Sequence, residues 1–252
     1  IETIEQYTKY VTKSGRLGQL KVFSLSNQKI SENYNLVGSG TATQLRDKIV
    51  ASLMWSEEYY KNQSSSFLLK LLIGLCHLRD CTGLKFHIGK ILSAAEDKNF
   101  VKELSKKIPV AATHEKKCLE QWFEFLIDNE NYRSIQGLRS QLESLVYSDF
   151  GKSITAVDGL SIFDIATKEE LGFIFLDTRK YGETAKAVGK FILQDLKMAS
   201  SRVDAEIPKV ERKPLTVVID EFADLAQEDF IGFLDRARSS KFLIVVAHQE
   251  IC

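Results

Sequence analysis

Residues 215–249 carry the clearest fold signal in the sequence and read LTVVIDEFADLAQEDFIGFLDRARSSKFLIVVAHQ. It opens with an apolar run, 215–219, followed by Asp220-Glu221, and it closes with a second apolar run, 242–247. Short continuous apolar runs are typical of strands that are covered on both faces. The segment between them has a helical pattern, so we expect two parallel strands joined by a right-handed crossover.

The same pattern extends towards the amino terminus. The run LGFIFLD, residues 171–177, is again apolar and ends in an acid, and residues 20–25 alternate like a strand. A helix face at 3.6-residue spacing lies between the runs 171–177 and 215–219; its apolar positions are Ala185, Val188, Gly189, Ile192 and Leu196. Strand, helix, strand, helix, strand predicts an α/β fold with a mainly parallel sheet.

Residues 41–150 have helical patterns almost throughout. Leu45, Ile49 and Leu53 recur every four residues, which predicts one helix from Thr41 to about residue 62. Serines at 64–66 then offer an N-cap for a second helix; this helix and the later ones are expected at 67–79, 98–106, 116–128 and 134–146. Residues 86–88 read equally as a short strand or a helix start. We therefore expect an all-helical domain, 41–150, inserted between two parts of an α/β core, 1–40 and 151–252.

Composition narrows the class of protein. In the 252 residues, 34 Lys and Arg balance 34 Asp and Glu, and 44% are hydrophobic, which excludes a disordered chain and disfavours a strongly basic nucleic-acid module. The segment 41–150 holds 15 basic and 14 acidic residues, which is an ordinary solvated helix surface. The long apolar run 67–78 is too short for a membrane span, which needs about 20 residues.

Candidate functional residues follow from where ligands bind in parallel sheets, which is outside the carboxyl ends of the strands. The polar residues predicted there are Asp177, Asp220, Glu221 and Gln249. An apolar strand ending in Asp-Glu is the Walker B arrangement, in which the Asp holds Mg²⁺ on nucleotide phosphates and the Glu orients or deprotonates the attacking water. A Gln amide on the neighbouring strand can contact that water and the γ-phosphate. The alternative is that these acids are solvated strand ends.

The phosphate-binding half of such a site is absent from these residues. No G-x-x-x-x-G-K-[ST] string occurs in the 252 residues. The glycine-rich segment 38–41 has no Lys and reads as a turn before a helix cap. We therefore expect no ATP hydrolysis by this chain alone.

Two strings resemble one family. Residues 215–249 resemble the Walker B to sensor region of the coupling-protein ATPases of conjugation and type IV secretion, the TraG/TraD-like relatives of hexameric DNA translocases. Residues 34–75, YNLVGSGTATQLRDKIVASLMWSEEYYKNQSSSFLLKLLIGL, resemble the part of that family that follows the P-loop and leads into an inserted all-helical domain. The resemblance implies a RecA-like core, 1–40 and 151–252, interrupted by the all-α domain 41–150.

The resemblance also implies roles for individual residues. Asp220 is implied to coordinate Mg²⁺, Glu221 to be the catalytic acid and Gln249 the sensor. Arg238, eleven residues before Gln249, falls where the family places an arginine finger that reaches a neighbouring subunit's nucleotide, and Arg236 is the alternative finger. An Arg in that position stabilises charge on the transferring phosphoryl group.

For the whole protein the resemblance implies ATP and Mg²⁺ as cofactors and a homo-hexamer that moves DNA, single- or double-stranded. Its partners would be relaxosome or effector proteins, recognised by the helical domain, and type IV secretion channel components. The full protein is expected at the cytoplasmic face of the bacterial inner membrane, with its membrane segment and P-loop upstream of Ile1, and the present residues are expected to be soluble. Two other functions remain open: a non-catalytic cargo adaptor or scaffold, and an unrelated RecA-like helicase or repair ATPase.

Overall fold

The computed structural model describes residues 2–225 and 228–247. The chain forms two compact units. The α/β unit contains Ile1–Tyr34 and Gly159–Cys252, and the helical unit contains Asn35–Asp158. The predicted fold class, α/β with parallel strands and an added helical part, is confirmed.

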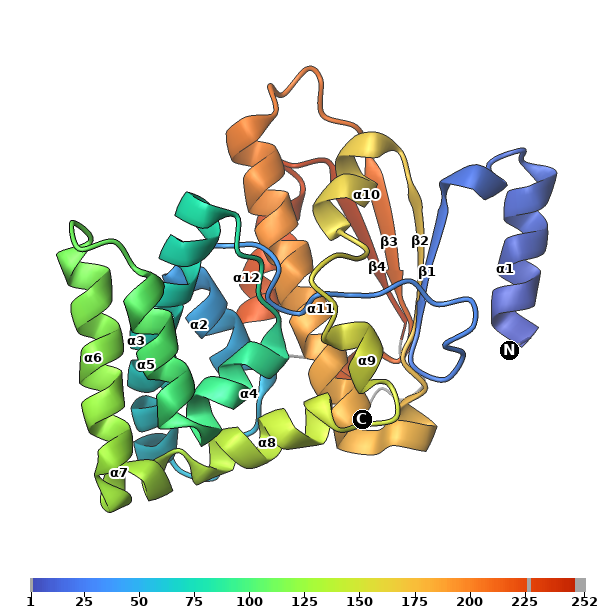
Figure 1. Ribbon diagram of the computed structural model, residues 1–252. Helices are drawn as coiled ribbons and strands as arrows, with labels where there is room; N and C mark the ends of the chain where they lie inside the picture. The colour runs from blue at the N-terminus through green and yellow to red at the C-terminus, as the bar shows by residue number, and fades with distance from the viewer. Residues whose placement is uncertain (1, 226–227, 248–252) are drawn as a thin grey trace. The chain divides into compact units, whose positions relative to one another are not determined.

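The described strands of the α/β unit form two parallel ladders (Figure 1). Its main elements are α1 (Glu2–Lys13), β1 (Leu20–Ser24), α10 (Ile162–Lys168), β2 (Leu171–Phe175), α11 (Thr178–Glu206), β3 (Leu215–Ile219), α12 (Glu228–Ala237) and β4 (Phe242–Val246). Leu20 pairs with Leu171 in the first ladder, and Leu215 pairs with Phe242 in the second. All five residues of each strand are paired in register, so the carboxyl ends of paired strands lie together.

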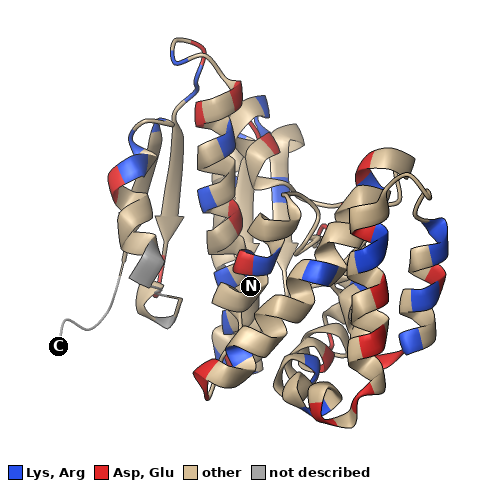
Figure 2. Ribbon diagram, turned by 90° about the vertical axis from the view of Figure 1, so that its left-hand side faces the viewer, with Lys and Arg blue, Asp and Glu red and all other residues tan. Residues whose placement is uncertain are grey.

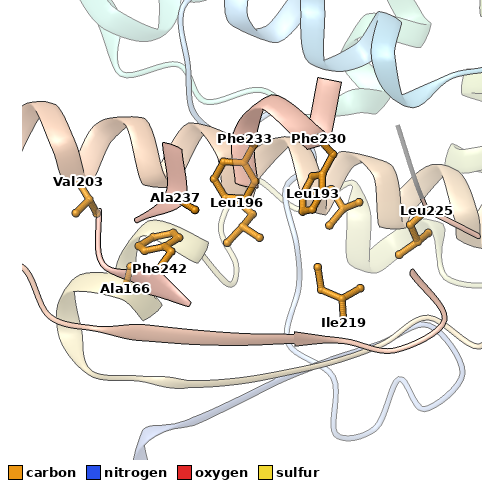
Figure 3. Close-up of a cluster of buried hydrophobic side chains, with 10 residues drawn as sticks. All are labelled: Ala166, Leu193, Leu196, Val203, Ile219, Leu225, Phe230, Phe233, Ala237 and Phe242. Atoms are coloured by element: carbon orange, nitrogen blue, oxygen red, sulfur yellow. The ribbon is translucent and has the colours of Figure 1, made fainter. Parts of the chain in front are cut away.

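One face of the β3–β4 ladder packs against α11 and α12. Leu193 and Leu196 on α11 face Phe230 and Phe233 on α12, with Ile219 of β3 beside them (Figure 3). The other members of this cluster are Ala166, Val203, Leu225, Ala237 and Phe242. Burying these side chains is the main force that holds the two helices on the ladder.

The other face of this ladder is open. Successive side chains of a strand point to opposite faces, and the register pairs Thr216 with Leu243 and Val218 with Val245 on the face away from the helices. These four residues are exposed, Val218 by 69% and Leu243 by 61%. The prediction of strands covered on both faces is therefore wrong for β3 and β4 among the described residues, because α11 and α12 both pack on the same face.

The helical unit is a bundle with a closed interior. Its helices are α2 (Ala42–Ser52), α3 (Glu58–Thr82), α4 (Ile88–Glu96), α5 (Lys98–Lys107), α6 (Thr113–Ile127), α7 (Asn129–Ser134), α8 (Gln136–Val146) and α9 (Gly151–Ile154). The ring of Trp122 on α6 lies 3.3 Å from that of Phe67 on α3, centroid to centroid. Two turns along α3, Gly74 lets the two helices approach, since a Cβ there would come within 2.6 Å of Leu119. Acidic and basic residues alternate along the outer helix surfaces (Figure 2).

The predicted helix from Thr41 to about residue 62 is wrong in its extent. Thr41 does cap α2 through a capping box with Gln44, but α2 ends at Ser52 and α3 begins at Glu58. The Gln141 side chain, on α8, accepts a hydrogen bond from the Met54 backbone N–H at 2.8 Å and donates one to the Met54 carbonyl at 2.7 Å. These two bonds replace the helical ones at Met54. The serines at 64–66 consequently lie inside α3 instead of capping a new helix.

The chain enters and leaves the helical unit at one place. The Asn35 amide donates to the carbonyls of Phe86, at 2.9 Å, and Val157, at 3.2 Å. Lys85 and Asp158 form an ion pair beside it. These contacts explain why the unit boundaries fall at 34/35 and 158/159, whereas the sequence placed them at 40/41 and 150/151. Residues 86–88 prove to be a helix start, in which His87 caps α4.

Among the described residues, no helix is both long enough and apolar enough to cross a membrane.

Candidate functional site at the carboxyl ends of the strands

Acidic residues follow both β2 and β3, and each adopts an unusual backbone conformation. Asp177, two residues after β2, has φ 50° and ψ 57°, and Glu221, two residues after β3, has φ 52° and ψ 40°. Both are left-handed conformations that a residue with a Cβ rarely adopts, because each raises the energy of the backbone by about 1–2 kcal/mol. Strain of this kind concentrates at functional sites, so the two strand ends are the first place to look for chemistry.

Asp220 and Glu221 form the acidic pair that the sequence singled out. Asp220 is exposed, and its Oδ1 accepts a hydrogen bond from the Glu221 backbone N–H at 3.0 Å. Glu221 starts a short 3-10 turn, Phe222–Asp224, and its side chain is half-buried. Both carboxylates thus lie at the carboxyl end of β3 and are accessible to solvent.

A cation that the sequence analysis did not identify lies at the same end. The Arg179 Nη2 lies 3.9 Å from Glu221 Oε1 and the Arg179 side chain is 87% exposed, so the pair is a loose surface contact. Arg179 is the second residue of α11, which begins directly after Asp177. The contact therefore brings the loops after β2 and β3 together. The sequence feature that could have identified Arg179 is its place two residues after Asp177, the acid that follows a strand.

The segment after β4 runs beside this pair. The Ala247 N–H donates to the Ile219 carbonyl at 2.9 Å, and the Phe222 N–H donates to the Ala247 carbonyl at 3.2 Å. Ala247 is the last described residue, and the predicted sensor Gln249 lies outside the described residues.

α11 closes tightly on this end of the strands. A Cβ at Gly189 would come within 2.5 Å of Leu225 and 2.8 Å of Leu176, so only glycine permits this approach. Leu176 follows β2 and Leu225 follows the short turn after Glu221. The loops that carry Asp177 and Glu221 thus rest on the same helix.

The two candidate arginine fingers lie at the opposite end of the strands. Arg238 is exposed in the turn after α12, and this turn joins the amino end of β4, where the Leu215 N–H donates to the Lys241 carbonyl at 3.1 Å. Arg236 is also exposed, and its Nε donates to the Gly232 carbonyl at 2.9 Å. Five strand residues separate this turn from Asp220, roughly 16 Å at about 3.3 Å per residue. Arg238 is therefore not brought to the acids of its own chain.

The acidic pair suits a nucleotide-bound Mg²⁺ better than a metal held by protein alone. Among the described residues, no group of three or more His, Cys, Asp and Glu could hold a metal ion. Mg²⁺ takes oxygen ligands and commonly uses one or two carboxylates together with substrate phosphates and water. The exposed carboxylate of Asp220 meets that requirement.

Comparisons with known proteins support the fold. No family model and no curated protein matches the sequence. Solved structures of the bacterial conjugative coupling protein TrwB do match: the unbound form has a TM-score of 0.60 and 12% identity, with 92% of this chain and 51% of that chain covered. TrwB in complex with ADP and Mg²⁺ matches with a TM-score of 0.60 and 11% identity, covering 92% and 52%.

TrwB bound to a non-hydrolysable ATP analogue gives the same TM-score, 0.60, with 13% identity and 92% and 52% covered. The resemblance to coupling proteins is thus confirmed at the level of the fold. The chain spans about half the length of the solved structures that it matches.

Proposed function

We propose that this chain is the central part of a conjugative coupling protein that uses ATP hydrolysis to move DNA, or a DNA–protein complex, towards a type IV secretion channel. The observation that carries the proposal is the Asp220-Glu221 pair, an exposed and a half-buried acid, at the carboxyl end of a parallel strand in the fold of a coupling protein that has been solved with ADP and Mg²⁺. On this proposal, the α/β unit, Ile1–Tyr34 and Gly159–Cys252, belongs to the RecA-like ATPase core, and the helical unit, Asn35–Asp158, is the inserted helical domain.

Each residue then has a defined task. Asp220 would hold the Mg²⁺ that neutralises charge on the phosphates, and Glu221 would orient the attacking water and take its proton. Arg179, whose Nη2 lies 3.9 Å from Glu221 Oε1, would help to orient that carboxylate towards the site. Arg238 would act on the nucleotide of a neighbouring copy, because it lies roughly 16 Å of strand away from its own acids.

Partners follow from the same proposal. The helical unit carries interspersed charges of both signs, which favours a protein partner over a phosphate backbone (Figure 2). We therefore assign relaxosome or effector recognition to this unit, and DNA contact to the assembled ring. Membrane attachment would be made by another part of the same protein.

The test compares Glu221→Gln with Glu211→Gln in a longer protein that carries this chain, since the 252 residues contain no phosphate-binding loop. Glu211 is a matched control, an exposed Glu in the loop before β3. Because Gln cannot accept the proton of water, we expect Glu221→Gln to lower kcat for ATP hydrolysis about 10²–10⁴-fold with nucleotide binding retained. DNA transfer between cells should fall in parallel.

Other results would point to the competing functions. Normal transfer with Glu221→Gln would indicate a cargo adaptor or scaffold. Loss of hydrolysis without any effect on transfer would indicate an unrelated helicase or repair ATPase.

A further inference from the structure

The turn that presents Arg238 is fixed by side chains from two other segments. It spans Arg238 to Lys241, between α12 and β4, and the Lys241 N–H donates back to the Arg238 carbonyl at 3.2 Å. Lys241 has φ 60°, a left-handed conformation that keeps the turn tight. The fixing contacts come from α11 and from the loop that precedes β3.

Arg212 is the centre of these contacts. Its guanidinium donates from Nη1 to Asp204 Oδ1 at 2.6 Å and to the Ser239 carbonyl at 2.8 Å. It also donates from Nη2 to the Asp204 carbonyl at 2.8 Å and from Nε to the Ile207 carbonyl at 2.9 Å. The Arg212 side chain is only 12% exposed, so these bonds are shielded from water. Arg212 thus ties the end of α11 to the residue next to Arg238.

Three further bonds hold the same turn. The Ser239 hydroxyl donates to Asp204 Oδ2, and the Ser240 hydroxyl shares a buried 2.7 Å hydrogen bond with Ser200 of α11. The Lys241 Nζ donates to the Arg212 carbonyl at 2.8 Å. Both sides of Ser239 are therefore anchored, whereas the neighbouring Arg238 side chain remains exposed.

We propose that Arg212 and Asp204 are positioning residues that hold the Arg238–Lys241 turn so that the Arg238 guanidinium meets a neighbouring copy's nucleotide in one orientation. This inference rests on the proposed function. A cation that acts across an interface contributes to catalysis only if it is already oriented, and a misplacement of about 1 Å can lower a rate 10²-fold. An exposed arginine on an untethered turn would lack that orientation.

The test is a double-mutant cycle of Arg212→Lys and Arg238→Ala in the longer, hydrolysing protein. Lys keeps a charge for Asp204 but cannot make the forked set of bonds that reaches the Ser239 carbonyl. Arg212→Lys should lower kcat about 10–100-fold and leave KM for ATP unchanged. In the Arg238→Ala background it should have no further effect on kcat, whereas its effect on the melting temperature should be the same in both backgrounds.

Arg202→Lys is the matched control. Arg202 also lies on α11, but its guanidinium binds the two carboxylate oxygens of Glu206, at 2.9 and 3.1 Å, and lies over the Phe163 ring instead of on the turn. It should leave kcat unchanged. Ser239→Ala removes a single hydroxyl, so it provides a second variant if Arg212→Lys does not fold, with the same direction and a smaller loss.

A second measurement follows the turn directly in the 252-residue chain. Trypsin cleaves after Arg238 only when the turn opens, so Arg212→Lys and Ser239→Ala should accelerate cleavage at that bond several-fold, and Arg202→Lys should not.

The outcomes separate the two proposals. Wild-type hydrolysis with Glu221→Gln would overturn both of them. The positioning role alone would be overturned if Glu221→Gln and Arg238→Ala both abolish hydrolysis but Arg212→Lys keeps the wild-type kcat. It would also be overturned if the loss of kcat with Arg212→Lys adds to the loss with Arg238→Ala.

Discussion

The two units of this chain differ in backbone strain and in whether a strand face is left exposed. The helical unit encloses an apolar interior that includes Trp122 and Phe67, and none of its described non-glycine residues has a left-handed backbone. The α/β unit leaves an apolar ladder face open and contains all the left-handed non-glycine residues that the structure describes, at Glu169, Asp177, Glu221 and Lys241.

The strained residues and the exposed apolar face lie in the unit that contains the candidate site. Strain and exposed apolar surface both lower stability, and proteins keep them where a ligand or partner compensates. Three of the four strained residues lie at the acidic site or in the turn that carries Arg238. We therefore expect the α/β unit to be the less stable of the two.

We expect the largest loss of stability from a substitution in the interior of the helical unit. Trp122 is 1% exposed, stacks on Phe125 at 4.8 Å and donates from Nε1 to the Ala94 carbonyl at 3.3 Å. Trp122→Ala should lower the free energy of unfolding of the helical unit by about 3–5 kcal/mol, because it leaves a large cavity. Calorimetry of the 252-residue chain would show a lower melting temperature for one of two transitions.

The control comes from the open face of the other unit. Leu243→Thr should change the free energy of unfolding by no more than about 0.5 kcal/mol, since that side chain is largely exposed. If Leu243→Thr lowers the free energy of unfolding as much as Trp122→Ala does, then the open face is covered in solution. The two units would then not differ in exposed apolar surface.

A smaller change in stability is expected from relieving the backbone strain at Glu221. Glu221→Gly should raise the free energy of unfolding of the α/β unit by up to about 1 kcal/mol, because glycine adopts the left-handed conformation without strain. Glu211→Gly, at a position outside the left-handed region, should instead lower it by about 0.5–1 kcal/mol. Urea denaturation of both variants measures the difference, and equal losses would mean that Glu221 stores no strain.

The smallest effect is a pH dependence confined to the helical unit. Burial, and then the charge of Lys90, lower the pKa of His87, whose neutral Nδ1 accepts the Gly89 N–H at 3.2 Å and caps α4. The unfolded chain therefore binds the proton first, so the helical unit should lose stability as the pH falls through about 6.5 towards the lowered pKa. Above that range this contribution is constant.

His87→Asn is the variant that tests this cause. Asn keeps a capping oxygen but does not titrate, so urea midpoints at pH 7.5 and 5.5 should differ less than in the wild-type chain. An unchanged pH slope would assign the effect to another group.

The elements that were predicted correctly are those whose burial follows a regular period. The runs at 171–175 and 215–219 are strands, and the expected helix at 98–106 is α5. The acids after β3 could be located because strand ends are where parallel sheets place ligands. In each case the signal is local: a residue's neighbours in sequence determine its environment.

The features that were missed depend on distant partners. The break after α2 is made by Gln141, 87 residues from Met54, and no local pattern marks it. The clamp on the Arg238 turn joins Arg212 to Ser239, 27 residues away. Arg179 and Glu221 likewise meet only once the two strand pairs have assembled. Side chains that recognise backbone carbonyls across such separations leave no period in the sequence.

The Asn35 amide, which joins the two ends of the helical unit, has an evolutionary consequence. Because residues 35 and 157 are one hydrogen bond apart, everything between them forms a loop with closed ends. Such a loop can be lengthened, shortened or exchanged by recombination without moving the strands on either side. The helical unit and the strands on either side of it can therefore change in sequence and length independently of each other.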